Sequence, residues 1–469
     1  MNAAKERELF EQVGVTTAIV RMAVPTVVGQ IILVIYNMAD TFFVGLTAND
    51  AMLTAVTVCM PAFMFLSAIS NLFGVGGASV ISRALGAGQE ARVRSTAAFA
   101  FWGCLFTALC YSLLAYLARD LFVDLLGGTN PEVHKNAVEY LNCTVVAGGA
   151  VTASGVLLSH LIRAEGRAMH ASAGIALGGV LNIALDPLFM FVLLPPGREA
   201  LGAALATTLS NAVSLVYFIV VLLRLRRRSH LAFRPSRACL ADKIPAAVLA
   251  AGIPACVMTL CENISYAILD KLMSFSGLPM QAGIGVAKKV NMLAHCIVRG
   301  IAQGSLPLIG YNYAAGNWSR MRASIRVSHL MAVGTATLCM AVSLVFARPL
   351  IGIFIHSSSP AHAYGETFLR ILCVGGPFSA SAYTFISFFQ ATGEGRKSFF
   401  LAMLRKGLVD IPLMFLLSSL LPIYGIVLAT PVTDALCCVV ANLLFAAYIR
   451  SGGKRRGKLQ DRSSATQPA

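Results

Sequence analysis

Apolar stretches long enough to cross a lipid bilayer recur along almost the whole chain, from Thr17 to Arg450. A helix needs about 20 apolar residues to span a bilayer core, and we count twelve such stretches, separated by polar connections. Because lipid offers the backbone no hydrogen-bond partner, a spanning segment must be a helix or a strand of a closed barrel. Barrel strands are about ten residues long and alternate in polarity. These stretches are long and continuously apolar, so the sequence predicts an all-α polytopic membrane protein with twelve transmembrane helices.

The overall composition agrees with a chain whose main solvent is lipid. Of the 469 residues, 57% are hydrophobic and only 12% are charged. That is far too apolar for an ordinary soluble domain. Almost all of the twelve cysteines lie inside apolar stretches without metal-ligand spacing, so we interpret them as small buried side chains. The polar N-terminal residues contain no apolar core of a cleavable signal peptide.

The chain has a net charge of +16, and most of its basic residues lie in alternate connections. Lys and Arg are concentrated before the first stretch and after the second, fourth, sixth, eighth, tenth and twelfth, whereas the intervening connections contain only Arg119, Lys135, Arg198 and Arg348. This distribution follows the positive-inside rule, which predicts that both termini are cytoplasmic. It argues against nucleic acid as a partner and leaves membrane lipid as the expected contact of the basic clusters.

The chain contains an internal repeat. At an offset near 229 residues, Pro25 meets Pro254, YNMAD (36–40) meets YAILD (266–270), and GAGQEARVR (86–94) meets AAGNWSRMR (314–322). RAEGR (163–167) similarly meets TGEGR (392–396), and GAALATTLSN (202–211) meets GIVLATPVTD (425–434). Each half has an even number of spans, so the two copies have the same orientation in the membrane. We therefore expect two six-helix bundles related by a parallel pseudo-two-fold axis, with a central cavity between them.

These patterns divide the chain into five parts. They are a cytoplasmic N-terminal segment (1–16), an N-lobe with helices one to six (17–223), a basic cytoplasmic linker (224–244), a C-lobe with helices seven to twelve (245–449), and a basic, disordered cytoplasmic tail (450–469).

Ionisable residues inside the apolar stretches are the candidate functional residues, because a charge in the bilayer costs about 2.5–3.5 kcal/mol on insertion scales. In the first half these are Asp40 and Asp186. Helical spacing places Asn182 one turn before Asp186, and Tyr36 and Asn37 beside Asp40. Such a cluster provides hard oxygen ligands for a cation or a site for a proton. The alternative is a polar contact that only holds helices together.

Other residues within the spans leave more than one interpretation open. Pro187 should kink the fifth helix beside Asp186, either as a static bend or as a hinge. Glu262, eight residues after Pro254, is the best placed of the second-half carboxylates, the others being Asp270, Asp410 and Asp434. Lys288 and Lys289 either neutralise one of these carboxylates or face water. Candidate cavity residues are Tyr36, Asn37, Met64 and Gln390.

We find no nucleophile elbow, phosphate-binding loop or zinc motif in the sequence. The protein is therefore not expected to be an enzyme, and it is not expected to use ATP directly.

Four motifs, in the expected helices of a twelve-span repeat, resemble those of the multidrug and toxic compound extrusion (MATE) transporters, especially their DinF- and MepA-like bacterial branch. They are PTVVGQIILVIYNMADTFFVG, GVGGASVISRALGAG, RAEG (163–166) and LNIALDPLFMF. The resemblance covers the chain from about Ala23 to Tyr448.

The resemblance implies two bundles that form a V and open alternately to each side of a bacterial cytoplasmic membrane, exchanging Na⁺ or H⁺ for organic, often cationic, molecules. It assigns the coupling cation, Na⁺ or H⁺, to Asp40, Asn182 and Asp186, with Thr207 as the fourth member of the site and the first three as Na⁺ ligands. Other branches use a glutamate of the seventh helix, whose place Glu262 takes here. No cofactor beyond the coupling ion is implied, and a monomer is expected because the cavity lies within one chain.

Two alternatives remain at this point. A lipid-precursor or polysaccharide flippase shares a related two-bundle architecture, but a larger and strongly basic cavity would be expected. An integral-membrane transferase would need polar catalytic residues converging near an interface. Substrate range and the choice between Na⁺ and H⁺ are not encoded in the residue pattern.

Overall fold

The computed structural model describes residues 8–47, 49–125, 130–235 and 237–464, and within these ranges it contains helices, turns and no strand. The first seven residues of the predicted N-terminal segment (1–16) lie outside these ranges. The main helices of the first half are α2 (Val15–Leu46), α3 (Asp50–Gly86), α4 (Glu90–Leu117), α6 (Pro131–Leu141), α7 (Gly149–Ala164), α8 (Ala168–Leu188) and α9 (Glu199–Arg224). The second half contains α10 (Ile244–Ser274), α11 (Leu278–Ala314), α12 (Trp318–Val345), α14 (Pro360–Val374), α15 (Gly376–Ala391), α16 (Gly395–Met403), α17 (Asp410–Leu420) and α18 (Tyr424–Ser464).

The twelve predicted spans are present, but three of them are interrupted helices. Among the described residues, nine helices are long and apolar enough to cross a membrane by themselves. The fourth and tenth spans are the bent pairs α6 with α7 and α14 with α15, with bends of 49° and 43°. The eleventh span consists of α16, a π-helix (η4, Leu404–Leu408) and α17. It contains Arg405, Lys406 and Asp410, which makes it more polar than the other spans.

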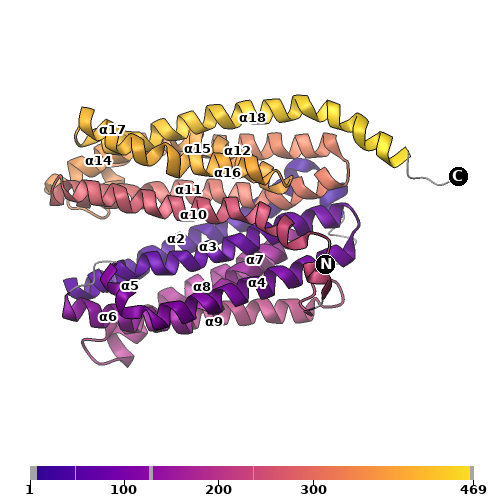
Figure 1. Cartoon of the computed structure of the whole chain (residues 1–469). Helices are drawn as coiled ribbons and strands as arrows, with labels where there is room; N and C mark the ends of the chain where they lie inside the picture. The colour runs from indigo at the N-terminus through magenta and orange to yellow at the C-terminus, as the bar shows by residue number, and fades with distance from the viewer. Residues whose placement is uncertain (1–7, 48, 126–129, 236, 465–469) are drawn as a thin grey trace.

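The helices form two bundles, which we call the N-lobe (α2–α9) and the C-lobe (α10–α18) (Figure 1). The connection between α9 and α10 runs from Leu225 to Lys243 and includes a short 3₁₀ turn, η3 (Arg237–Leu240). Both chain ends lie at one end of the molecule in Figure 1, which we call the terminus-bearing end. This arrangement requires an even number of spans, as predicted.

The internal repeat is visible in the backbone. Gly88 and Gly316 occupy equivalent turns and both adopt positive φ angles, +70° and +74°, which glycine tolerates best. In the turns after α7 and α15, the positive φ angles belong to Gly166 (+85°) and Gly393 (+78°). The sequence alignment instead paired Gly166 with Gly395, two residues further on. The sequence alignment matched the glycine of RAEGR with the second glycine of TGEGR. The backbone angles instead show that Gly166 and Gly393 occupy equivalent positions in their turns.

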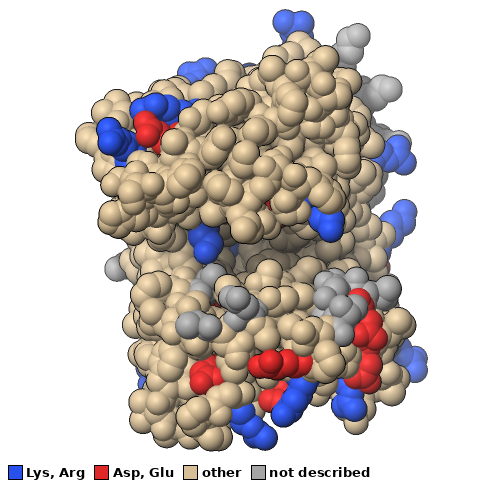
Figure 2. All heavy atoms as spheres, turned by 90° about the vertical axis from the view of Figure 1, so that its left-hand side faces the viewer, with Lys and Arg blue, Asp and Glu red and all other residues tan. Residues whose placement is uncertain are grey.

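The lobes contact each other closely at the terminus-bearing end. Glycines allow the backbones to meet there: a Cβ atom added to Gly252 of α10 would lie only 1.7 Å from the carbonyl oxygen of Leu72 in α3. A Cβ atom at Gly304 of α11 would lie 2.7 Å from Cα of Ala23 in α2. At the opposite end the surface is hollowed between the two lobes (Figure 2). The structure is therefore closed at the terminus-bearing end and open at the other.

Two sequence expectations concern helix ends. α8 continues as an α-helix through Pro187 and then becomes a π-helix, η2 (Phe189–Leu193), so the irregular backbone follows the proline. The sequence predicted a disordered tail from residue 450, but in the structure α18 continues through Ser464. Its Lys, Arg, Leu and Gln residues are good helix formers, and extending an existing helix avoids the cost of nucleation. Residues 465–469 lie outside the described part of the chain.

Candidate functional site

Three of the predicted site residues meet inside the N-lobe. Asn182 and Asp186 lie one turn apart on α8, and Asn182 Nδ2 donates to Asp186 Oδ1 at 3.2 Å. The same amide nitrogen lies 3.3 Å from Thr207 Oγ1 on α9. All three side chains are buried, and Asp186 has no exposed surface. The amide of Asn182 therefore joins the carboxylate of α8 to the hydroxyl of α9.

Asp40 approaches this group from α2, which packs against α8. Its side chain is buried and interacts electrostatically with Asp186, and Tyr36 is within electrostatic range of both carboxylates. Within the described residues, Asp40 Oδ1, Asn182 Oδ1 and Asp186 Oδ2 are buried without a hydrogen-bond partner. No Lys or Arg of the described chain forms an ion pair with Asp40 or Asp186. We call Asp40, Asn182, Asp186 and Thr207 the N-lobe acidic site.

The N-lobe acidic site has the chemistry of a site for a small hard cation. Its free atoms are two carboxylate oxygens and one amide oxygen, and hard cations prefer such ligands. Two neighbouring carboxylates without a compensating charge also favour binding a proton. Among the described residues, no three His, Cys, Asp or Glu side chains are placed so that they could hold a metal ion together.

The candidate cavity residues belong to three helices: Tyr36 and Asn37 to α2, Met64 to α3 and Gln390 to α15. Asn37 Nδ2 donates to the backbone oxygen of Leu33 at 2.7 Å, which occupies part of its hydrogen-bonding capacity. Met64 is half-buried in α3. Gln390 is buried near the terminus-bearing end of α15, and its backbone oxygen accepts a hydrogen bond from Ser79 Oγ of the N-lobe at 2.5 Å. Gln390 therefore lies in the contact between the lobes, away from the open hollow.

Glu262 in α10 lies in a different electrostatic setting from the N-lobe carboxylates. Its Oε2 accepts a hydrogen bond from Arg299 Nη2 of α11 at 2.8 Å, and its Oε1 accepts one from the Tyr383 hydroxyl at 3.3 Å. The Arg299 side chain is 31% exposed and the Glu262 side chain 11%. Glu262 is therefore already paired with a cation of the protein itself.

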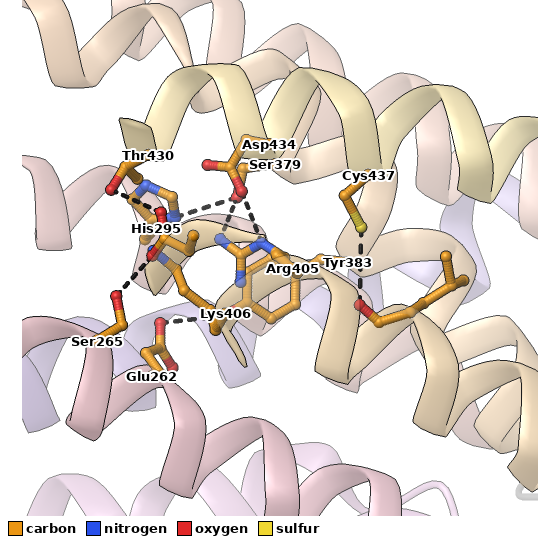
Figure 3. Close-up of polar contacts among 12 residues, drawn as sticks. Glu262, Ser265, His295, Ser379, Tyr383, Arg405, Lys406, Thr430, Asp434 and Cys437 are labelled. Atoms are coloured by element: carbon orange, nitrogen blue, oxygen red, sulfur yellow. Dashed lines mark hydrogen bonds and ion pairs between the residues drawn. The ribbon is translucent and has the colours of Figure 1, made fainter. Parts of the chain in front are cut away.

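Further ion pairs lie deeper in the C-lobe (Figure 3). Arg405 Nε donates to Asp434 Oδ1 at 2.8 Å, and Arg405 Nη2 donates to Ser379 Oγ at 2.7 Å. Lys406 Nζ donates to Asp410 Oδ2 at 3.0 Å. The four charged side chains are at most 2% exposed. Lys288, which the sequence left without an assigned partner, pairs with Asp270.

Sequence reasoning missed Arg299, Arg405 and Lys406. It searched the spans for carboxylates, and the only basic residues it considered within the spans were Lys288 and Lys289. A search for Lys and Arg inside the apolar stretches would have found all three. The spacing of Lys406 and Asp410, four residues apart on one helix, also indicates an ion pair.

Two six-helix bundles with an unpaired acidic site and a hollow between them define a helical membrane transporter. The sequence model of the MatE family matches the chain twice, over residues 25–188 and 254–416. The chain belongs to this family, and its two matches correspond to the two lobes.

Relatives and solved structures of the family are similar to almost the whole chain. The multidrug export protein MepA of Staphylococcus saprophyticus is 27% identical over 439 residues, 93% of this chain and 94% of that protein. MepA of Staphylococcus aureus is 26% identical over 441 residues, again 93% and 94% of the two chains. A crystal structure of MATE in complex with MaD3S has a TM-score of 0.87 at 25% identity, covering 96% and 99% of the chains. An outward-facing multidrug resistance MATE transporter has the same TM-score at 24% identity, covering 95% and 98%.

Proposed function

We propose that the protein is a secondary active multidrug exporter that exchanges Na⁺ or H⁺ for small organic molecules, often cationic, by alternating access. The observation that carries this proposal is the N-lobe acidic site, which holds two buried carboxylates without a basic partner in the described chain. Leaving such charges unpaired in a membrane is costly, which favours a site that is filled by a mobile cation. Relatives named multidrug export proteins support the substrate class.

Coupling follows from the position of the N-lobe acidic site between helices. Asp40 belongs to α2, which contacts α8 within the N-lobe and α11 of the C-lobe. A cation bound between Asp40 and Asp186 would draw α2 and α8 together and thereby change how α2 meets α11. If substrate prefers the arrangement without the cation, each ligand weakens binding of the other, as thermodynamic reciprocity requires.

We assign coupling to the N-lobe rather than to Glu262. The guanidinium of Arg299 lies 2.8 Å from Glu262 and neutralises it within the protein. An external cation would have to displace a tethered one, which is present at high effective concentration. Asp40 and Asp186 have no such competitor in the described residues.

The orientation in the membrane is also part of the proposal. We place the protein in the bacterial cytoplasmic membrane with the terminus-bearing end in the cytoplasm, because the basic connections and the basic tail lie on that side of the spans. The hollow in Figure 2 then opens to the exterior. A monomer is sufficient for the cycle, because both lobes and the hollow belong to one chain.

Dye efflux from proteoliposomes tests this function. The purified protein is reconstituted with a fluorescent organic cation, and efflux is recorded under an imposed Na⁺ or H⁺ gradient. We expect gradient-driven efflux by the wild type and its loss in Asp40→Asn and Asp186→Asn. Asp124→Asn is the matched control, because its side chain is 57% exposed at the open end. Wild-type efflux by Asp40→Asn would sink the proposal, and efflux insensitive to both gradients would contradict cation coupling.

A further inference from the structure

The C-lobe contains a copy of the N-lobe acidic site. The repeat that relates the lobes pairs residues of the two sites one by one: DPLFMF after Leu185 corresponds to DIPLMF after Val409, so Asp186 corresponds to Asp410. Both aspartates lie beside a π-helical turn, η2 in the N-lobe and η4 in the C-lobe. The equivalent pairs are Tyr36 and Tyr266, Asp40 and Asp270, Asp186 and Asp410, and Thr207 and Thr430.

In both copies, the aspartate accepts a hydrogen bond from the residue four positions before it. In the N-lobe, the residue four positions before the aspartate is Asn182, whose amide lies 3.2 Å from Asp186 and 3.3 Å from Thr207. In the C-lobe, that position is Lys406, whose ammonium lies 3.0 Å from Asp410. Thr430 Oγ1 donates to the other oxygen of Asp410 at 3.2 Å. The C-lobe copy therefore has a lysine ammonium where the N-lobe has a neutral amide.

The C-lobe copy has two basic residues, Arg405 and Lys406, that the N-lobe lacks, and each of them is paired with a carboxylate. In the N-lobe, Asn211 Nδ2 donates to Thr152 Oγ1 at 3.0 Å, a neutral contact. The equivalent C-lobe residues are Asp434 and Ser379, and Arg405 lies between them, bonded to both. The pair Leu181–Asn182 of the fifth span is thus replaced by Arg405–Lys406 in the eleventh. Arg405 pairs with Asp434, a carboxylate that the N-lobe lacks at this position. Lys406 pairs with Asp410, whose N-lobe equivalent is also an aspartate, Asp186.

The second carboxylate of the copy also has its own cation. Lys288 pairs with Asp270, the counterpart of Asp40. The ammonium groups of Lys288 and Lys406 lie 5.4 and 5.3 Å from the ring centroid of Tyr266, the counterpart of Tyr36. The C-lobe copy therefore contains two carboxylates and two lysines, while the N-lobe acidic site contains two carboxylates and no basic group among the described residues.

We propose that the C-lobe holds a second, internally blocked copy of the cation site, in which the ammonium of Lys406 takes the place of the transported ion. The inference rests on the proposed function, because it gives the N-lobe acidic site the role of the working ion site. Lys406 then determines ion stoichiometry: one coupling ion is bound per chain, and removing the ammonium opens a second site built from Asp410, Thr430 and Ser265, whose hydroxyl donates to Asp410 at 2.5 Å.

The test replaces Lys406 with asparagine, the residue found at the equivalent N-lobe position 182. It does so in a protein whose N-lobe acidic site is disabled by Asp186→Asn. The melting temperature of purified full-length protein is measured in detergent against sodium chloride, with choline chloride as the salt control, and against pH. The variants are Asp186→Asn, Lys406→Asn, Asp186→Asn with Lys406→Asn, and that pair with Asp410→Asn added. Lys406→Arg in the Asp186→Asn background keeps a cation in the C-lobe copy and serves as the matched control.

We expect Asp186→Asn to lose the ion response of the wild type and Lys406→Asn to restore a response of about the same size. Adding Asp410→Asn should remove it again, and the Lys406→Arg control should show none. A folded Asp186→Asn, Lys406→Asn protein that responds to neither sodium nor protons overturns the proposal. If the wild type itself does not respond, the proposed coupling fails, and a response gained by Lys406→Asn alone still supports the blocked copy.

A second measurement does not depend on the folding of the Asn variant. Binding of radiolabelled sodium, or proton uptake if the wild type responds only to pH, gives the number of ions per wild-type chain. One ion per chain is expected. Two ions per chain would show that the C-lobe copy is open and would overturn the inference. Lys406→Met, which replaces the ammonium with an apolar side chain of similar length, should raise the number from one to two.

Discussion

Phe10 stacks face to face on Tyr311, with ring centroids 4.7 Å apart and ring planes inclined by 9°. Phe10 precedes the first helix of the N-lobe, and Tyr311 belongs to α11 of the C-lobe. Arg320 of α12 holds the same segment, with Nε donating to the backbone oxygen of Phe10 at 2.6 Å and Nη2 to that of Val13 at 2.5 Å. The segment from Phe10 to Val13 thus binds to α11 and α12 of the C-lobe and connects the two lobes at the terminus-bearing end.

Replacing Phe10 with alanine should weaken the closed arrangement at that end. The Phe10 side chain is 2% exposed, and deleting a buried phenyl ring costs about 3–5 kcal/mol. We expect spin-label distances across the terminus-bearing end to shift to longer values. Phe106→Ala is the control, because Phe106 is 69% exposed on the lipid-facing side of α4. Identical distance distributions for both variants would contradict a fastening role for Phe10.

A methyl group at Gly86 should separate the lobes at the same end. A Cβ atom there would lie 2.1 Å from the backbone oxygen of Tyr311, so the α3 and α11 backbones must move apart. Overpacking of this kind costs about 1–3 kcal/mol and applies only while the lobes are closed there. Gly86→Ala should therefore populate the opposite conformation, measured by labelling of a cysteine placed in the contact. Gly334→Ala, with no described atom within 4 Å of its added Cβ, should change nothing.

The effects of replacing Glu262 and Arg299 on the free energy of unfolding should depend strongly on each other. Arg299→Gln leaves a largely buried carboxylate without its cation, which costs about 3–5 kcal/mol. Glu262→Gln alone should also destabilise the protein, and the double variant should recover most of the loss. A double-mutant cycle from denaturant unfolding measures this coupling. Additive losses would show that the two side chains act independently and would reopen Glu262 as an ion ligand.

Glu165 should control the order of the connection between the lobes. Its carboxylate is buried and accepts hydrogen bonds from Ser229 Oγ and the backbone nitrogen of His230, each at 2.7 Å. Hydrogen bonds to a charged group contribute about 1.5–3 kcal/mol. Glu165→Ala should therefore speed amide hydrogen exchange at His230. Asp120→Ala, a change at a 67% exposed carboxylate, should leave that exchange rate unaltered.

The class of structure and the positions of the main carboxylates could be predicted from the amino-acid sequence. Span length follows from bilayer thickness, and the repeat follows from local matches, so neither needs tertiary information. The high cost of charge in lipid made Asp40 and Asp186 conspicuous. The bends of the fourth and tenth spans and the register of Gly166 against Gly393 were not readable, because both depend on backbone geometry at a few residues.

The packing of the helices determines which carboxylates are paired with a Lys or Arg side chain. Glu262 and Arg299 are 37 residues apart in the sequence, and Arg405 and Asp434 are 29 apart, so their pairing depends on how separate helices pack. From the sequence, Asp186 is a candidate ion ligand of the first half, and Glu262 is a candidate of the second half. The fold gives Glu262 a guanidinium and leaves the N-lobe carboxylates without one in the described chain. Electrostatic interactions act through space, and the distances that set them exist only after the helices have assembled.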